Sequence, residues 1–170
     1  SKILYIPAGT FELSSIWYIF ASDVTITGAG MWYTNLKFTN PNPFGGGISG
    51  GNGSHGPDGY CNNVEICNLY LNSNLRSRHN QQAVYKCFMD VFKGGSVIHH
   101  VWEDHFECGF WIGDYNGKVD YSNDLKIISC RIRNNFADGV NFCQGTSNAT
   151  VYNCSVRNNG DDGLAMWNDH

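Results

Sequence analysis

The sequence has few charged side chains and few prolines, and it contains no long apolar run. Charged residues make up 15% of the 170 positions, and four residues are proline. No uncharged apolar segment approaches the roughly 18 residues of a membrane-spanning helix, so we expect no membrane partner. The formal net charge is −4, and no basic stripe is present. We therefore expect no nucleic-acid partner either.

Helical periodicity is also missing, because no segment repeats apolar residues at i, i+3, i+4 and i+7 over three turns. The chain instead contains 20 Gly and 20 Asn, and 14% of its residues are aromatic. This balance is typical of many short strands joined by turns. Segments such as "LKIISCRI" (125–132) and "ATVYNCSV" (149–156) alternate β-branched and other residues, which indicates strands.

One stretch near the C-terminus occurs twice. Residues 125–142 and 149–166 are identical at six of eighteen positions, at an offset of 24. A fixed period of about 20 to 50 residues indicates a solenoid. The identical residues are Cys130, Arg133, Asn134, Asn135, Asp138 and Gly139, which recur as Cys154, Arg157, Asn158, Asn159, Asp162 and Gly163.

The repeat predicts an all-β fold, a right-handed single-stranded parallel β-helix with rungs of about 24 residues. We expect residues 1–170 to form a single domain that is part of a longer protein. Stacked rungs should place Cys130 against Cys154 as free thiols, and the Asn pairs should form a ladder at a corner. A β-sandwich is the competing architecture, but it does not require near-identical consecutive units.

A fainter copy of the repeat lies at 95–112, "GSVIHHVWEDHFECGFWI", and matches 125–142 at an offset of 30. This alignment predicts that Trp102 occupies the inward position of Ile132. It also places Trp111 at the polar position of Asn141, where a tryptophan can stack on a sugar ring.

Cysteines and glycosylation sequons bear on where the protein works. Seven cysteines cannot all pair within one chain. Asn-x-Ser/Thr triplets begin at Asn52, Asn148 and Asn153, and they are candidate glycosylation sites. With the low charge, these features favour a secreted, extracellular protein.

Three aspartates coincide with the repeat. Asp138 and Asp162 are equivalent positions on adjacent rungs, which should lie about 4.8 Å apart. Asp161 is an additional acid, because the first copy has Ala137 there. An Asp-Gly pair is a turn signal, so the aligned acids have a purely structural alternative, but that alternative does not account for Asp161. Mutual repulsion favours one of the three carboxyls keeping its proton.

The segments "FADGVNFCQGTSN" (136–148) and "VRNNGDDGLAMW" (156–167) resemble glycoside hydrolase family 87, the α-1,3-glucanases and mycodextranases. "GAGMWYTNLKF" (28–38) and "IHHVWEDHFECGFWIGDY" (98–115) resemble that family's preceding rungs, so the resemblance covers most of the chain. It implies a right-handed parallel β-helix and three catalytic aspartates, which fall on Asp138, Asp161 and Asp162. Polygalacturonases and family 49 dextranases use a similar trio.

The leading hypothesis is a glycoside hydrolase that cleaves an α-glucan, first of all an α-1,3-glucan, with inversion. Inversion needs an acid and a base about 6.5–9.5 Å apart. We assign Asp161 as the acid, and Asp138 with Asp162 as the base. Trp111 and Trp167 are the candidate sugar-binding residues, and the partner is a polysaccharide.

No metal or cofactor is needed for this chemistry. His99, His100 and His105 do not stand at zinc-ligand spacing beside suitable cysteines, so we interpret them as structural.

The alternative hypothesis is a non-catalytic β-helix that serves as a structural or glycan-binding component of an extracellular matrix or filament. Open rungs can pair between chains, so this alternative also predicts end-to-end self-association. It differs from the first hypothesis in releasing no reducing sugar from any α-glucan.

Overall fold

The computed structural model describes residues 2–40, 45–51, 59–76, 86–113 and 122–167, and every regular element in these ranges is a β-strand. None of these residues lies in a helix that is long and apolar enough to cross a membrane. The strands are β1 (Lys2–Ile6), β2 (Gly9–Leu13), β3 (Trp17–Tyr18), β4 (Val24–Gly28), β5 (Thr34–Phe38), β6 (Ile48–Ser49), β7 (Cys61–Asn62), β8 (Glu65–Ser73), β9 (Lys86–Asp90), β10 (Phe92–Lys93), β11 (Val97–Asp104), β12 (Cys108–Ile112), β13 (Lys126–Ile128), β14 (Arg131–Arg133), β15 (Val140–Cys143), β16 (Thr150–Tyr152), β17 (Ser155–Arg157) and β18 (Leu164–Trp167).

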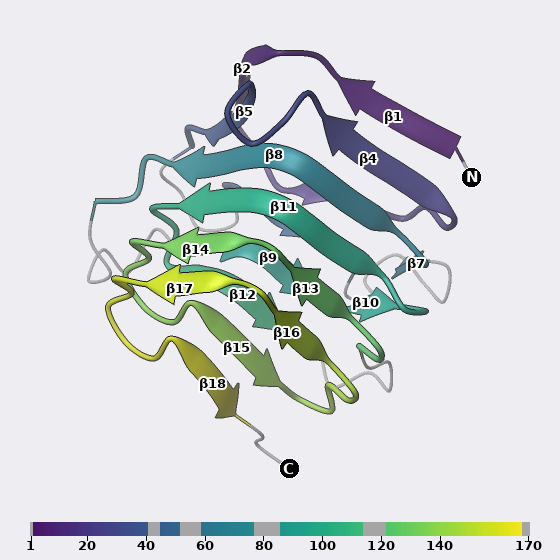
Figure 1. Cartoon of the computed structure of the whole chain (residues 1–170), viewed down its shortest axis with the longest axis vertical. Helices are drawn as coiled ribbons and strands as arrows, with labels where there is room; N and C mark the ends of the chain where they lie inside the picture. Colours follow the sequence, from purple (N-terminus) through teal and green to yellow (C-terminus); the bar gives the residue numbers. More distant parts are fainter. Residues whose placement is uncertain (1, 41–44, 52–58, 77–85, 114–121, 168–170) are drawn as a thin grey trace.

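The strands form two large parallel sheets and one small one. A ten-stranded sheet runs in the order β1-β4-β8-β11-β13-β16, with β2, β5, β14 and β17 paired alongside. A six-stranded sheet runs β18-β15-β12-β9-β6-β3, and β10 pairs with β7. The chain alternates between the two large sheets, and each pass pairs with the one before it (Figure 1). This arrangement is that of a parallel β-helix.

The length of a rung varies along the chain. The predicted 24-residue offset holds between the last two rungs, where β13 pairs with β16 and β14 pairs with β17. Earlier rungs are longer or shorter, because loops of different length connect the strands. Successive offsets are 22, 40, 32, 29 and 24 residues, through the pairs Lys2↔Val24, Thr25↔Glu65, Glu65↔Val97, Val97↔Lys126 and Lys126↔Thr150.

One predicted alignment is wrong by a single residue. The offset of 30 holds in the six-stranded sheet, where Trp111 pairs with Asn141, but it is 29 in the ten-stranded sheet, where Trp102 pairs with Arg131. Trp102 therefore lies on the outer face, and Glu103 takes the inward position opposite Ile132. The later rung carries the additional residue at its Asn corner, between the two sheets.

Corners of the β-helix use left-handed backbone conformations. Asn and Asp adopt this conformation more readily than other non-glycine residues, which explains why the sequence has so many Asn. Equivalent corner residues with positive φ recur on successive rungs. They are Asp23, Asn63, Asp124 and Asn148 before one strand, Asn68, His100, Ser129 and Asn153 at a bend, and His105, Asn134 and Asn158 at a third corner.

The core is a set of columns of like side chains. Ile66, Ile98 and Ile127 pair in register and are fully buried. Cys130 and Cys154 stack as predicted, because the Cys130 amide donates to Cys154 Sγ at 3.4 Å and both cysteines are free thiols. All seven cysteines of the chain are free.

A polar ladder crosses the third corner. The side chain of Asn135 donates from Nδ2 to Asn159 Oδ1 at 2.9 Å, which confirms the predicted stacking of the Asn pairs. The same Nδ2 donates to Glu103 Oε1 at 2.7 Å, and Asn135 Oδ1 accepts the Phe106 amide at 3.2 Å. Asn135 thus connects three consecutive rungs from a buried position.

We predict that Asn135→Ala lowers the free energy of unfolding by about 2–3 kcal/mol, because it leaves a buried backbone donor and a buried carboxyl without this partner. Asn123→Ala is the matched control at an exposed position, and it should change stability by less than about 0.5 kcal/mol. Chemical denaturation of both variants measures the difference. Equal stabilities would show that the corner ladder contributes nothing.

Candidate active site

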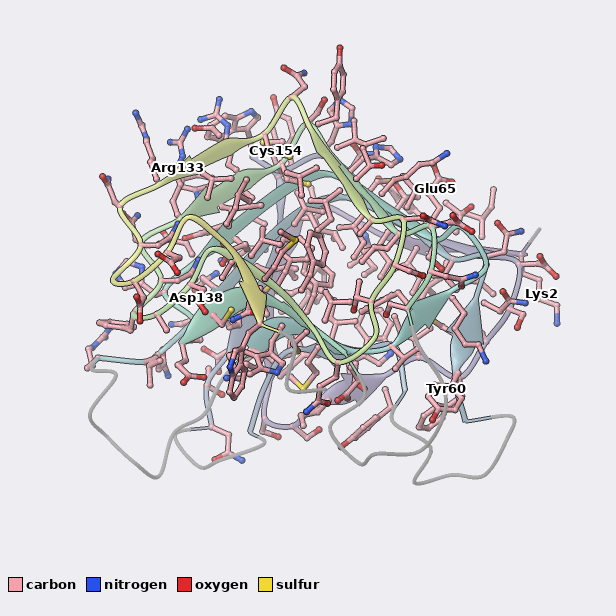
Figure 2. The ribbon with its side chains drawn as sticks, turned by 90° about the horizontal axis from the view of Figure 1, so that it is seen from below. Lys2, Tyr60, Glu65, Arg133, Asp138 and Cys154 are labelled. Atoms are coloured by element: carbon pink, nitrogen blue, oxygen red, sulfur yellow. The ribbon has the colours of Figure 1, made fainter. Side chains whose placement is uncertain are left out.

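Three carboxylates meet where two neighbouring strands of the six-stranded sheet begin. Asp138 lies two residues before β15, and Asp161 and Asp162 lie just before β18, its partner strand. One oxygen from each of the three carboxylates lies within 4.8 Å of the others. Asp138 is buried at 8% exposure, whereas Asp161 and Asp162 are exposed. Figure 2 shows Asp138 beside the last strands of the β-helix.

Main-chain hydrogen bonds between rungs hold this arrangement. The Gly139 amide donates to the Asp162 carbonyl at 2.9 Å, and the Asp161 amide donates to the Ala137 carbonyl at 3.2 Å. The Asp162 amide also donates to Asp138 Oδ1 at 3.2 Å. The repeat therefore brings the three predicted acids together. Asp138 in addition caps a neighbouring backbone amide, as the structural alternative expects of a turn aspartate.

Asn141 orients the buried member of the trio. Its Nδ2 donates to Asp138 Oδ2 at 2.8 Å, and Asn141 itself is buried at 4% exposure. Both oxygens of Asp138 thus accept a hydrogen bond from a fixed donor, which holds the carboxyl group in one orientation. Sequence comparison of the two copies missed this residue, because Ala165 occupies the equivalent position on the next rung.

A cation and two indoles lie along the same sheet, with Lys86 on β9, Trp111 on β12 and Trp167 on β18. Lys86 forms an ion pair with Glu107, and its Nζ lies 4.1 Å from the centre of the Trp111 ring. Trp111 and Trp167, the two predicted sugar-binding residues, contact each other edge to face with ring centres 5.9 Å apart. Trp167 is the more exposed of the two. Because Lys86 covers one face of Trp111, that face is not open to a sugar.

Cys108 lies next to the trio but is not a nucleophile. It stands on the rung before Asp138, in the same column, and it is fully buried. Burial raises the pKa of the Cys108 thiol well above its usual range, and the nearby charge of Lys86 opposes this only in part. The thiol is therefore neutral, whereas a nucleophilic cysteine must be a thiolate.

Glu103 is an acid that sequence analysis overlooked, because the one-residue error in alignment concealed its inward position. Burial raises the pKa of Glu103 well above its usual range, although the hydrogen bond from Asn135 opposes the shift. A neutral Glu103 lies directly beneath Gly109, where an added Cβ would approach Oε1 to 2.5 Å. We assign Glu103 to the polar core rather than to the reacting groups.

Candidate glycosylation sites lie on the surface where they are described. Asn148 and Asn153 are both exposed corner residues. Asn153 also donates from Nδ2 to the Ser129 hydroxyl at 3.0 Å. Asn52 lies outside the described residues.

Two groups of side chains, within the ranges that the structure describes, are close enough to share a metal ion. One is the aspartate trio, and the other is Glu65, Cys67 and His99 on the ten-stranded sheet.

Comparison with known proteins identifies relatives over the whole chain. A family model described as alpha-1,3-glucanase catalytic domain D2 matches residues 1–169. The crystal structure of the Agl-KA catalytic domain is 53% identical with a TM-score of 0.87, and the match covers 98% of this chain and 29% of that one. No curated protein sequence matches.

Structures of catalytic domains from glycoside hydrolase family 87 α-1,3-glucanases are also similar. One, in complex with tetrasaccharides, is 27% identical with a TM-score of 0.70, covering 94% of this chain and 26% of that one. Another, in complex with nigerose, is 25% identical with a TM-score of 0.69, covering 98% and 27%. Three of these structures each carry a single Asp-to-Ala substitution, at three different positions. The second lies 23 positions after the first, and the third follows directly.

The glycines that follow the two aligned aspartates, Gly139 and Gly163, differ in how much space surrounds them. An added Cβ on Gly139 would lie 2.7 Å from both Asn159 Nδ2 and the Gly163 carbonyl oxygen, so Gly139→Ala must push two rungs apart. We expect a loss of about 1–3 kcal/mol in the free energy of unfolding. Gly163→Ala is the matched control, because its Cβ would meet Val156 Cγ1 at an ordinary 3.6 Å. Thermal unfolding of both variants tests this, and equal midpoints would contradict it.

Proposed function

Because the chain belongs to the α-1,3-glucanase catalytic domain family, we propose that its aspartate trio hydrolyses the glycosidic bonds of an α-1,3-glucan. The observation that carries this proposal is the convergence of three carboxylates within 4.8 Å on adjacent rungs. The chain spans 29% of the length of the Agl-KA structure, so the proposed activity belongs to the protein that contains this segment.

The spacing of the acids supports the same proposal. Asp161 lies 23 positions after Asp138, and Asp162 follows it directly. The three aspartates replaced in the relatives have this spacing, and those relatives bind nigerose and tetrasaccharides. We therefore propose an α-glucan oligosaccharide or polysaccharide as the substrate of this trio.

Asp138 and Asp162 are suited to hold the attacking water. A water that donates to two oxygens at about 2.8 Å each separates them by about 4.5 Å, given its own bond angle. One oxygen from each carboxylate lies within 4.8 Å of the others, an upper limit that includes the separation one bridging water needs. Asp138 is held by Asn141 and by the Asp162 amide, so its oxygens do not need to reorient when the water is deprotonated.

Asp161 is the proposed proton donor. It has no acidic counterpart in the preceding rung, where Ala137 stands, and it is exposed to an approaching substrate. Its carboxyl group is the one member of the trio that lies outside the stacked pair of Asp138 and Asp162. General acid catalysis at the leaving oxygen then needs no metal ion.

The separation of the carboxyl groups bears on the stereochemistry of the reaction. Acid and base in inverting enzymes are usually about 6.5–9.5 Å apart, and about 5–5.5 Å apart in retaining ones. The nearest oxygens of the trio are within 4.8 Å, which is shorter than the inverting range. We propose inversion because a pair that holds one water requires this closeness between Asp138 and Asp162, and Asp161 is the separate, exposed acid.

Trp167 is the proposed sugar platform. About half of its surface is exposed, and its ring packs against Trp111, which in turn lies under the Lys86 ammonium group. Trp111 therefore supports the Trp167 ring, which keeps an open face for stacking. Trp167 is thus the residue proposed to stack on the sugar, and Trp111 is proposed to support it. Both remain part of the proposed binding surface.

We also propose a right-handed β-helix and an extracellular location. Connections between parallel strands of one sheet are right-handed in about 98% of cases. A polysaccharide cannot enter a cell, and the exposed Asn148 and Asn153 are open to glycosylation. The cysteines give no support to secretion, because all seven are free thiols.

Our first functional prediction concerns the stereochemistry of the product. Hydrolysis of α-1,3-glucan by the protein should release the β-anomer first, because water attacks the face opposite the leaving group. Proton NMR during the first minutes of the reaction distinguishes this from the α-anomer, which would show retention. Dextran, nigeran and polygalacturonate serve as comparison substrates. Release of no reducing sugar from α-1,3-glucan or from any of these comparison substrates would favour the non-catalytic β-helix.

Our second functional prediction separates the acid from the base. Asp161→Asn should slow cleavage of α-1,3-glucan by about 10²–10⁴-fold, as expected for a lost general acid. It should slow a nitrophenyl α-glucoside much less, because that leaving group needs little protonation. Steady-state rates on both substrates give the ratio.

Asp138→Asn and Asp162→Asn are the matched variants, and each should slow both substrates alike, because both reactions need an activated water. If Asp162→Asn spares the nitrophenyl substrate while Asp161→Asn does not, the two roles are reversed.

A further inference from the structure

A second cluster of chemically reactive side chains lies on the ten-stranded sheet, away from the aspartate trio. Glu65 and Cys67 belong to β8, and His99 belongs to β11, where it pairs directly with Cys67. The intervening Ile66 is fully buried in the core, so Glu65 and Cys67 face outward. Figure 2 shows Glu65 and Asp138 on different sides of the β-helix.

The three potential ligand atoms converge. Glu65, Cys67 and His99 each offer one oxygen, sulfur or nitrogen atom, and these atoms lie within 4.8 Å of one another. His99 Nε2 is 2.8 Å from Glu65 Oε1. In a tetrahedral zinc site, bonds of about 2.0–2.3 Å place two ligands about 3.3–3.8 Å apart. Side-chain movements of about 1 Å would therefore bring the three ligand atoms to the separations of a tetrahedral zinc site.

Each of the three side chains also has a hydrogen-bond partner outside the cluster. The Thr25 hydroxyl donates to Glu65 Oε2 at 2.9 Å, which leaves Oε1 directed at His99. Asn68 Nδ2 donates to Cys67 Sγ at 3.4 Å. His99 Nδ1 is 2.8 Å from His100 Nδ1, so the second ring nitrogen of His99 is engaged while Nε2 faces the cluster. Partners of this kind orient the ligands of metal sites.

The surroundings suit a bound cation with one open position. Cys67 is buried at 4% exposure, whereas the side chains of Glu65 and His99 are partly exposed. A pocket of about 370 Å³ opens beside the cluster, and its lining includes Glu65, His99 and Asp23.

We propose that Glu65, Cys67 and His99 bind a zinc ion, with a water molecule from the adjacent pocket as the fourth ligand. The donor set decides the metal. Zinc accepts sulfur, imidazole nitrogen and carboxylate oxygen together, whereas Ca²⁺ and Mg²⁺ require oxygen ligands. Sequence analysis interprets His99 as structural because the ligands are 32 positions apart, and only the pairing of β8 with β11 joins them.

Such an ion would fasten consecutive rungs of the β-helix. It would connect β8 to β11 directly, and the hydrogen bond from Thr25 would extend the connection to β4. Because the unfolded chain does not hold these ligands together, binding stabilises the folded state by mass action. The ion has no part in the proposed hydrolysis, since the trio lies in the other sheet.

Cobalt substitution tests the site directly. Co²⁺ bound to a thiolate gives an intense near-ultraviolet charge-transfer band, so titration of the metal-free protein should produce this band at one equivalent. Zn²⁺ should displace it, and Ca²⁺ should not. The band should disappear in Cys67→Ser and in His99→Gln, with circular dichroism confirming that each variant is folded.

Cys154→Ser is the matched control. Cys154 is partly exposed, and its hydrogen bond with Cys130 lowers its pKa to about 6, so adventitious metal would bind that thiolate first. We expect Cys154→Ser to keep the cobalt band, and Thr25→Val to weaken Zn²⁺ binding by about 10–100-fold. A band lost in Cys154→Ser but kept in Cys67→Ser would overturn the proposal, and so would the absence of any band in the unchanged protein.

Discussion

Parallel pairing of each rung with the next is the constraint on which the other features depend. Main-chain hydrogen bonds fix neighbouring rungs about 4.8 Å apart, so a residue type that recurs in the sequence becomes a column in space. The column of Ile66, Ile98 and Ile127 builds the core, and the Asn135–Asn159 pair closes a corner. The same pairing stacks Asp138 on Asp162, although their like charges repel. The stability of the ladder therefore supports an arrangement that electrostatics alone would not select.

The protein manages its buried acids in two different ways. Asp138 lies at the edge of the core, and two hydrogen-bond donors, the Asp162 amide and Asn141, hold its carboxyl group in one orientation. Glu103 lies fully inside, where burial raises its pKa and keeps it neutral, and it accepts a hydrogen bond from Asn135. An acid at the rim can therefore serve chemistry, while an acid within the core serves packing. Asn135 links Glu103 to the Asn corner that directly precedes the trio.

The two large sheets carry different reactive side chains on their outer surfaces. Alternate residues of each strand point outward, so each sheet presents its own set of side chains to solvent. Outward residues of β8 and β11 include Glu65, Cys67 and His99, and outward residues further along include Tyr70 and Trp102, whose rings lie 4.5 Å apart. The six-stranded sheet carries the trio together with Trp111 and Trp167. A mixed donor set on one sheet and a carboxylate trio on the other can thus act independently, joined only by the shared core.

The sequence alone determined the β-helical class, the stacking of the last two rungs and the meeting of Asp138, Asp161 and Asp162, because a repeat of constant length translates directly into register. It could not determine the register of the earlier rungs, whose offsets vary from 22 to 40 residues. A single additional residue at the Asn corner of the later rung shifted the sequence alignment by one position, so the outward Trp102 and the inward Glu103 were exchanged in the prediction. The bond from Asn141 to Asp138 and the convergence of Cys67 with His99 were likewise decided only by the tertiary structure. Both depend on which strands lie side by side, and loop lengths, which follow no period, set that.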